Sequence, residues 1–190
     1  MNLIGSHNTM SYLKVAHWWL RPLRITARCQ HKNLIDQLAN PIIDVLDLRV
    51  RFSNRLHKWV FCHGLIDFDS SVGVGAVAEY IHCRRGNRAV IRLLLERGTS
   101  SLDMNRFEQL CRQLEEEYPE ITFIGGRTKK GWHLVYDFKG NARFRDADIS
   151  QPVSSMSEQA RWYERILPIA FFRRIGHLPA SAPITLYDFV

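Results

Sequence analysis

The sequence predicts an α/β fold in which a mostly parallel sheet of about seven strands alternates with helices. Two observations lead to this prediction. Short apolar runs bounded by turn residues alternate with amphipathic segments through the middle of the chain, a pattern typical of parallel β-α units. The chain has 190 residues, fewer than the roughly 250 typical of an eight-fold α/β barrel. We therefore expect a compact or incomplete TIM-type (β/α) barrel, with residues 1–190 forming one domain.

The expected strands are short apolar runs. The first ends near His7, and the run Ala89–Leu95 is interrupted only by Arg92, which is typical of a buried strand. The other strands are expected at residues 44–52, 58–62, 121–125, 132–138 and 184–189.

The clearest helix is expected over Ser101–Glu117, where apolar residues recur at helical spacing and Pro119 follows the end. Residues 12–30 are mostly helical in composition, with Pro22 interrupting or restarting the pattern. Shorter helices are expected at 33–38 and 77–83, a loop at 139–152, and a second long helix at 157–172 with Pro168 inside it.

The composition is that of an ordinary globular domain with a formal net charge of +7. A basic surface suits anionic lipid or nucleic acid, although plain solubility explains this charge equally well. The basic residues are spread along the chain without a recognised binding motif, so nucleic acid is not an expected partner. The four cysteines lack Cys-x-x-Cys spacing, which favours reduced thiols over a zinc site or disulfides. They are Cys29, Cys62, Cys83 and Cys111.

The sequence predicts a cytoplasmic protein. Peripheral contact with a membrane surface is compatible with this prediction. No apolar run approaches transmembrane length, and the N-terminus lacks the pattern of a secretory signal. His7 lies so near Met1 that cleavage of a leader would remove it. The oligomeric state is left open.

Polar side chains of catalytic type follow several of the predicted strands. His7 follows the first strand, and His63 ends the third and precedes Gly64. Asp47 and Arg49 alternate with apolar residues and therefore share one face of the second strand. In a parallel barrel the carboxyl ends of the strands converge on one face. Two histidines and an arginine there supply a general base, a general acid and a phosphate clamp, a set that cleaves a phosphodiester without metal.

Structural interpretations of these residues stay open beside the catalytic one. His7 is also typical of a turn or cap, and His63 of a packed histidine at a strand end. Asp47 and Arg49 suit a structural ion pair, and Glu96, which follows another strand, suits a solvated charge.

The motifs together resemble the X-region of phosphatidylinositol-specific phospholipase C. Gly5-Ser6-His7-Asn8-Thr9 is similar to the first histidine motif of eukaryotic members, and Asp47-Leu48-Arg49 to the second motif of secreted bacterial members. His63-Gly64 is similar to the second histidine motif. The segment Ile184–Val190 resembles the closing strand of the family barrel, which carries an acidic residue, here Asp188.

The resemblance implies cleavage of an inositol phospholipid or a related phosphodiester. His7 would remove the proton from the inositol 2-hydroxyl, and His63 would protonate the departing diacylglycerol oxygen. Arg49 would stabilise charge on the phosphoryl oxygens, where a guanidinium group suits two oxygens at once. Asp188 would orient His7, and Asp47 would position Arg49 or His63. The first product would be a cyclic inositol phosphate.

The resemblance also implies substrate contacts by Asn8 and Glu96. Arg127 follows two glycines that would let the backbone approach a ligand, so it is a further candidate for substrate contact, with an ordinary loop arginine as the alternative. Asn8 stands where bacterial members have Asp, which implies slower turnover. Asn8, Asp47 and Glu96 occupy the positions of oxygen ligands in calcium-dependent members, so calcium is the alternative cofactor. Because Arg49 places a fixed positive charge there, we expect no cofactor and no metal.

The segment after the first motif mixes aromatic residues with cations. Trp18, Trp19 and Arg21 suit a membrane interface, and the family places an interfacial helix here. The alternative is that the tryptophans pack inside the protein.

Other classes of function remain as alternatives. One is a catalytically inactive module that binds phospholipid head groups or membranes. Another is a metal-dependent glycerophosphodiester phosphodiesterase, which requires several carboxylates around a divalent ion and which Arg49 disfavours.

Overall fold

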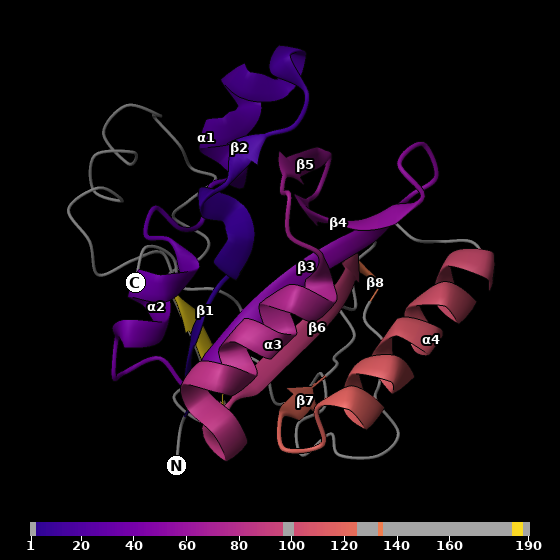
Figure 1. Ribbon diagram of the computed structural model, residues 1–190. Helices are drawn as coiled ribbons and strands as arrows, with labels where there is room; N and C mark the ends of the chain where they lie inside the picture. Colours follow the sequence, from indigo (N-terminus) through magenta and orange to yellow (C-terminus); the bar gives the residue numbers. More distant parts are fainter. Residues whose placement is uncertain (1–2, 97–100, 125–132, 135–183, 188–190) are drawn as a thin grey trace.

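The computed structural model describes residues 3–96, 101–124, 133–134 and 184–187. Within these ranges, nine strands join into one mixed sheet, with helices packed against it (Figure 1). The predicted loop at 139–152 and helix at 157–172 lie outside the described residues.

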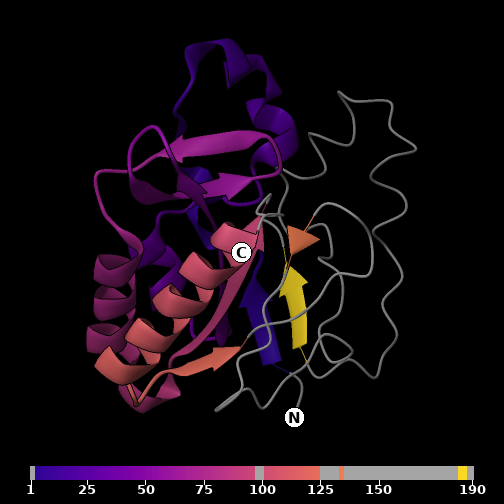
Figure 2. The same ribbon diagram turned by 90° about the vertical axis from the view of Figure 1, so that its right-hand side faces the viewer.

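Five strands run parallel and lie side by side in the order β9, β1, β3, β6, β7. Figure 2 shows β9, in yellow, next to the indigo β1. The longest pairing joins β3 to β6, from Val45 opposite Val90 to Val50 opposite Leu95. The bounds are β1 (Leu3–Ser6), β3 (Val45–Ser53), β6 (Val90–Glu96), β7 (Thr122–Ile124) and β9 (Ile184–Tyr187).

The predicted barrel is wrong, because the described strands form an open mixed sheet. Half of the strand pairings are antiparallel: β4 pairs with β3 and with β5, β5 pairs with β2, and β8 pairs with β6. The additional strands are β2 (Lys14–Val15), β4 (Lys58–His63), β5 (Ile66–Asp69) and β8 (His133–Leu134).

Short connections explain the antiparallel pairs. Only residues 54–57 join β3 to β4, whereas a parallel pair needs a crossover of a dozen or more residues. His57, at the end of this turn, has a φ of 48°. Gly64 and Leu65 alone join β4 to β5, and Gly64 has a φ of 56°, a conformation that glycine adopts without strain. The glycine after His63 is therefore explained by a tight hairpin turn.

Three predicted helices are confirmed, and their local signals explain them. Asn33 caps α2 by accepting a hydrogen bond on Oδ1 from the backbone N–H of Asp36 at 3.0 Å. The apolar spacing of α4 places Phe107, Cys111 and Leu114 in the core. The helices are α2 (Leu34–Ala39), α3 (Val74–Arg85) and α4 (Ser101–Glu117).

Residues 12–30 do not form the predicted helical segment. They are divided among short pieces, because Pro22 sits inside one of them and β2 pairs with β5 between two others. The pieces are η1 (Thr9–Tyr12), β2, η2 (Trp18–Leu23) and α1 (Arg24–Ala27), and one further turn, η3 (Gly86–Arg88), precedes β6.

The two faces of the sheet differ in chemistry. Alternate residues of β3 and β6 join the apolar core together with α3 and α4, which lie on one side of these strands (Figure 1). The residues between them point to the opposite face, where four buried side chains are charged. The core residues are Leu46, Leu48, Val50, Ile91, Leu93 and Leu95, and the charged residues are Asp47, Arg49, Arg92 and Glu96.

Candidate active site

The candidate site lies at a gap along one edge of β3, between the residues that pair with β1 and those that pair with β4. β6 occupies one edge of β3 from Val45 to Val50. On the other edge, the pairing with β1 ends at Leu46 and the pairing with β4 begins at Val50. Asp47–Arg49 therefore has no strand partner on that edge among the described residues. We call this gap, with the ends of β1 and β4 that border it, the strand fork.

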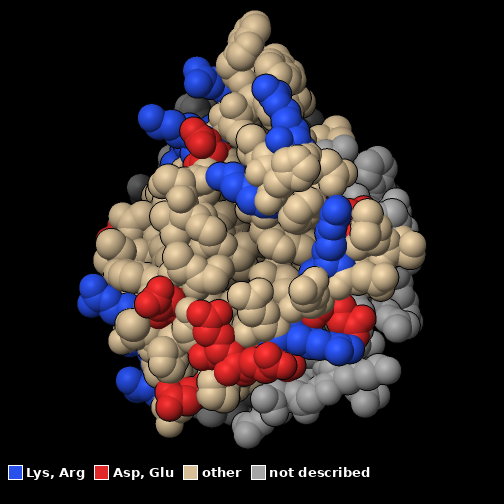
Figure 3. Space-filling model, turned by 45° about the vertical axis from the view of Figure 1, so that its right-hand side comes forward, with Lys and Arg blue, Asp and Glu red and all other residues tan. Residues whose placement is uncertain are grey.

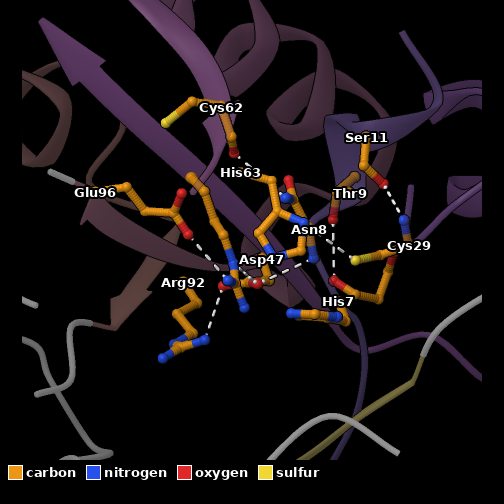
Figure 4. A network of polar contacts seen from close by, with 12 residues as sticks. His7, Asn8, Thr9, Ser11, Cys29, Asp47, Cys62, His63, Arg92 and Glu96 are labelled. Carbon is orange, nitrogen blue, oxygen red and sulfur yellow. Dashed lines mark hydrogen bonds and ion pairs between the residues drawn. The ribbon is translucent and has the colours of Figure 1, made fainter. Parts of the chain in front are cut away.

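Asn8 ties the two strand ends together across the fork. Its backbone N–H donates to Asp47 Oδ2 at 3.0 Å, and its Nδ2 donates to the Cys62 carbonyl at 3.3 Å. The residue has a φ of 43°, in the left-handed region that asparagine tolerates better than most residues. This turn directs the chain away from β3 immediately after His7 (Figure 4).

The fork brings the two predicted histidines together. The ring centroids of His7 and His63 lie 5.7 Å apart, with an interplanar angle of 88°. His7 is 5% exposed and His63 is partly buried. His63 Nδ1 lies 2.9 Å from the Ala27 carbonyl oxygen. Because a carbonyl only accepts, this contact places the proton of neutral His63 on Nδ1 and leaves Nε2 for proton transfer.

The surroundings of His63 favour its neutral form. Burial lowers the pKa of the imidazole, and the positive charge of Arg49 lowers it further, to about 4. Glu96 acts in the opposite direction but does not offset these effects. His63 is therefore neutral near pH 7 in the protein without ligand.

Four buried charged side chains form one network in the fork. Arg49 donates from Nε to Asp47 Oδ2 at 2.8 Å and from Nη1 to Glu96 Oε1 at 3.0 Å. Arg92 donates from Nη1 to Asp47 Oδ1 at 2.9 Å. The other Glu96 oxygen accepts a hydrogen bond from the backbone N–H of Gly64. Two carboxylates thus balance two guanidinium groups, and both oxygens of each carboxylate have partners.

The network holds its members charged. Burial alone would raise the pKa of Asp47, but Arg49 and Arg92 lower it well below its usual range. Burial would lower the pKa of Arg49, yet Asp47 and Glu96 raise it above its ordinary value. Within the described ranges, Nη2 of Arg49 has no hydrogen-bond partner. The carboxylates therefore fix the guanidinium group while one of its nitrogens stays available to a ligand.

The structure thus places His7, Asn8, Asp47, Arg49, His63 and Glu96 together. Asp47 contacts Arg49 and orients it. The solvated-charge interpretation of Glu96 is wrong, because Glu96 is fully buried and ion-paired. Arg127 and Asp188 lie outside the described residues.

Two residues of the site were not predicted. Arg92 did have a signal, since it is the only charge inside an apolar strand, and it lies opposite Asp47 in the strand register. Cys29 had none, yet its Sγ lies 3.6 Å from His63 Nδ1. The loop after α1 carries it there, held by hydrogen bonds from the backbone N–H groups of Cys29 and Gln30 to Ser11 Oγ (Figure 4).

The segment around Trp18 forms an exposed end of the molecule. Trp18 is 71% exposed and Trp19 is 55% exposed, so the alternative in which both pack inside is wrong. Arg21 is also exposed, and η2 buries none of its residues. Figure 3 shows basic side chains around the upper end of the molecule and most acidic ones in its lower half. No helix in the described ranges has the length and apolar character of a membrane span.

Comparison of the chain with protein-family models, with curated proteins and with solved structures gave no match in any of the three. The resemblance to phosphatidylinositol-specific phospholipase C therefore rests on the short sequence motifs alone.

Proposed function

We propose that the protein is a metal-independent phosphodiesterase that cleaves an inositol phospholipid or a related phosphodiester with a neighbouring hydroxyl. The observation that carries the proposal is the convergence in the fork of His7, which follows β1, Arg49 on β3 and His63 at the end of β4. A purely structural role would not require two histidines beside a guanidinium group that keeps one nitrogen for a ligand.

The proposed reaction is an internal transfer. His7 takes the proton of the inositol 2-hydroxyl, and the oxygen attacks the adjacent phosphorus. The bond from phosphorus to the diacylglycerol oxygen breaks, and His63 gives that oxygen a proton from Nε2. Diacylglycerol and a cyclic inositol phosphate result. The rings are close enough for both to reach oxygens of one phosphoryl group.

His63 must carry an additional proton to act as the acid. Its low pKa, about 4, belongs to the protein without substrate. A bound phosphodiester brings a negative charge next to the imidazole and offsets the effect of Arg49, which raises the pKa of His63. Substrate binding therefore favours the protonated form of His63, which then gives its proton to the diacylglycerol oxygen.

Arg49 stabilises the charge that develops on the phosphoryl oxygens. Asp47 and Glu96 hold Nε and Nη1, so Nη2 is oriented before substrate arrives. Such preorganised donors require little rearrangement during the reaction and are among the largest contributions to catalysis.

The same contacts favour metal-independent catalysis over a calcium site. A calcium ion at Asn8, Asp47 and Glu96 would have to displace two guanidinium groups and two backbone N–H groups from the carboxylates. The Oδ1 atom of Asn8 is buried without a hydrogen-bond partner in the described part of the chain, which suits contact with a substrate hydroxyl.

Asp188 remains the proposed orienting residue of His7. Ser6 lies opposite Tyr187 in the parallel register of β1 and β9. His7 and Asp188 directly follow these two residues in sequence, and Asp188 lies outside the described residues.

The roles of the histidines can be tested with two substrates that differ in the leaving group. The natural alkoxide needs protonation, whereas a nitrophenolate leaves without it. We expect His63→Ala to slow cleavage of phosphatidylinositol roughly a hundredfold or more, but to have little effect on a nitrophenyl inositol phosphate. His7→Ala should slow both reactions to a similar extent, because both need the base.

The matched control is His17→Ala, which changes a histidine that faces Asp67 outside the fork. It should retain the wild-type rate on both substrates. If His7→Ala or His63→Ala retains nearly full activity on the lipid, the assignment of that residue is wrong.

A further inference from the structure

Cys29 places a sulfur ligand beside the two histidines. One ring nitrogen of His7, one of His63 and Sγ of Cys29 all lie within 4.8 Å of one another. His7 and Cys29 are each 5% exposed, and His63 is partly buried. This cluster is formed by the loop after α1 and by the ends of β1 and β4.

We propose that His7, Cys29 and His63 bind a borderline-soft divalent ion of the zinc type, and that the ion inhibits the enzyme. Two imidazole nitrogens and one thiolate are a ligand set for zinc, which often keeps a fourth position for water. Calcium and magnesium prefer oxygen ligands, so the donor set selects against them.

The spacing supports this ligand set. Bonds of about 2.3 Å to sulfur and about 2.0 Å to nitrogen at a tetrahedral angle separate the two ligand atoms by about 3.5 Å. The observed distance from Cys29 Sγ to His63 Nδ1 is 3.6 Å. The remaining pairs lie within 4.8 Å, and His63 must turn its Nδ1 away from the Ala27 carbonyl to bind the ion.

Arg49 disfavours a positive charge at His63, so the carboxylates of the fork and the Cys29 thiolate must offset it when the ion binds. Arg49 and Arg92 are balanced by Asp47 and Glu96, so the buried network has no net charge. The Cys29 thiolate would supply one negative charge directly to the ion.

Metal binding and catalysis exclude each other at this site. Nδ1 of His63 directs its proton to the Ala27 carbonyl at 2.9 Å, and an ion at this nitrogen displaces that proton. The same ion occupies a nitrogen of His7, the proposed base. Inhibition therefore rests on the proposed function, whereas metal binding itself does not.

Cobalt(II) spectroscopy tests binding without any substrate. Chelator-treated protein titrated with Co²⁺ should develop a thiolate-to-cobalt charge-transfer band and the visible bands of a tetrahedral site, which Zn²⁺ abolishes. Cys29→Ser should lose the charge-transfer band, and His7→Gln should weaken Co²⁺ binding at least about 100-fold. Cys83→Ser, which changes an exposed cysteine, is the control and should retain both signals. A wild-type protein without the band, or a band that persists in Cys29→Ser, would overturn the proposed site.

The effect on catalysis is measured separately as the ratio of rates with and without Zn²⁺. Wild-type cleavage should be inhibited at the concentrations that displace Co²⁺, and the ratio should approach one in Cys29→Ser. Equal inhibition of both proteins would overturn the inhibitory role. If the cobalt bands form but no phosphodiester is cleaved, the metal site stands and the proposed function fails. If a phosphodiester is cleaved but the cobalt bands do not form, the proposed function stands and the metal site fails.

Discussion

Strand β3 carries two arginine–aspartate pairs that differ in how the arginine is used. Arg49 donates from Nε to Asp47 and from Nη1 to Glu96, and it is almost fully buried. Arg51 directs both Nε and Nη2 to the single carboxylate of Asp67, and 27% of its side chain is exposed. The Arg51 pair borders an open hollow of about 470 Å³, lined also by basic residues and Trp59.

We interpret the Arg51 pair as structural and the Arg49 pair as one that orients a guanidinium group for the proposed site. Arg51 ties β3 to β5, and all of its guanidinium contact goes to one partner. Arg49 is held from two sides, and neither carboxylate contacts its Nη2. Because burial of charges removes their hydration, a network such as that of the fork is weak evidence for stability. We propose that its position beside two histidines serves the catalytic role of Arg49.

The largest expected effect comes from replacing the two arginines in turn and comparing the rates of cleavage. Arg49→Met should lower the rate roughly 100- to 1000-fold, as for loss of one preorganised donor. It should also lower the free energy of unfolding by about 3 to 5 kcal/mol, because Asp47 and Glu96 lose their shared partner. Arg51→Met should retain the rate within about twofold and lose less stability, since its pair is partly solvated. Steady-state kinetics and urea unfolding measure both quantities.

Arg49→Lys refines the test, because it keeps the charge but not the planar guanidinium group. Its rate should fall between those of the wild type and Arg49→Met. If Arg51→Met is as slow as Arg49→Met, the distinction between the two pairs is wrong.

The second test removes or adds metal. We propose that Arg49 supplies the positive charge that an ion would otherwise supply, so wild-type cleavage should not decrease in a chelator or increase with calcium. Arg49→Asp should be inactive without metal, and it tests whether calcium then restores the rate. Wild-type activity that is lost in chelator and restored by calcium alone would move Asn8, Asp47 and Glu96 into a calcium site.

The third test concerns pH and the stability that neutral His63 contributes. Its pKa is about 4 in the folded protein against an ordinary value of 6.5, so the unfolded chain binds the proton more readily. This contribution is present above about pH 6.5 and is lost as the pH falls to about 4. The loss lowers the free energy of unfolding by at most about 3 kcal/mol. His63→Gln should therefore lose less stability than the wild type between pH 7 and pH 4.

Urea unfolding at each pH gives the required free energies. The control is Leu102→Ala, which changes an exposed residue without a titratable group and whose stability should fall with pH as steeply as that of the wild type. Equal slopes for the wild type and His63→Gln would show that His63 is not held neutral in the folded state.

Membrane contact by η2 should give the weakest effect. Replacing Trp18 and Trp19 by Ala should weaken binding to anionic vesicles severalfold, because both side chains are exposed beside Arg21. Added salt should weaken binding of the wild type as well, since attraction is screened beyond about 10 Å at 0.1 M. Leu102→Ala changes an exposed apolar residue on α4 and should have no effect. Vesicle sedimentation that is unchanged by the tryptophan substitutions would contradict an interfacial role.

The sequence predicted the elements whose signals are local. The apolar spacing of Ser101–Glu117 and the amphipathic pattern of residues 33–38 predicted α4 and α2. The alternation of Asp47 and Arg49 with apolar residues correctly placed both on one face of β3. The predicted barrel is wrong because residues 54–57 are too few for a parallel crossover, so β4 pairs antiparallel with β3.

The composition of the site was only partly predictable, because it depends on the path of the chain between elements. The histidines and Arg49 could be found from short motifs at strand ends. The approach of Cys29 to His63 depends on the loop after α1 and its hydrogen bonds to Ser11, which no periodicity reveals. The exposure of Trp18 likewise follows from the breakup of residues 12–30 into short pieces.

The chemistry proposed for the fork is cleavage of a phosphodiester by internal transfer without metal. Phosphorus NMR of reactions in chelator, with phosphatidylinositol and with a soluble analogue, is its sharpest test because it identifies the product as well as the rate. We predict that the wild type forms the resonance of a five-membered cyclic inositol phosphate from both substrates, and that His7→Ala and Arg49→Met form little or none. No product from either substrate, or only an acyclic phosphate from the outset, would contradict internal transfer at the fork.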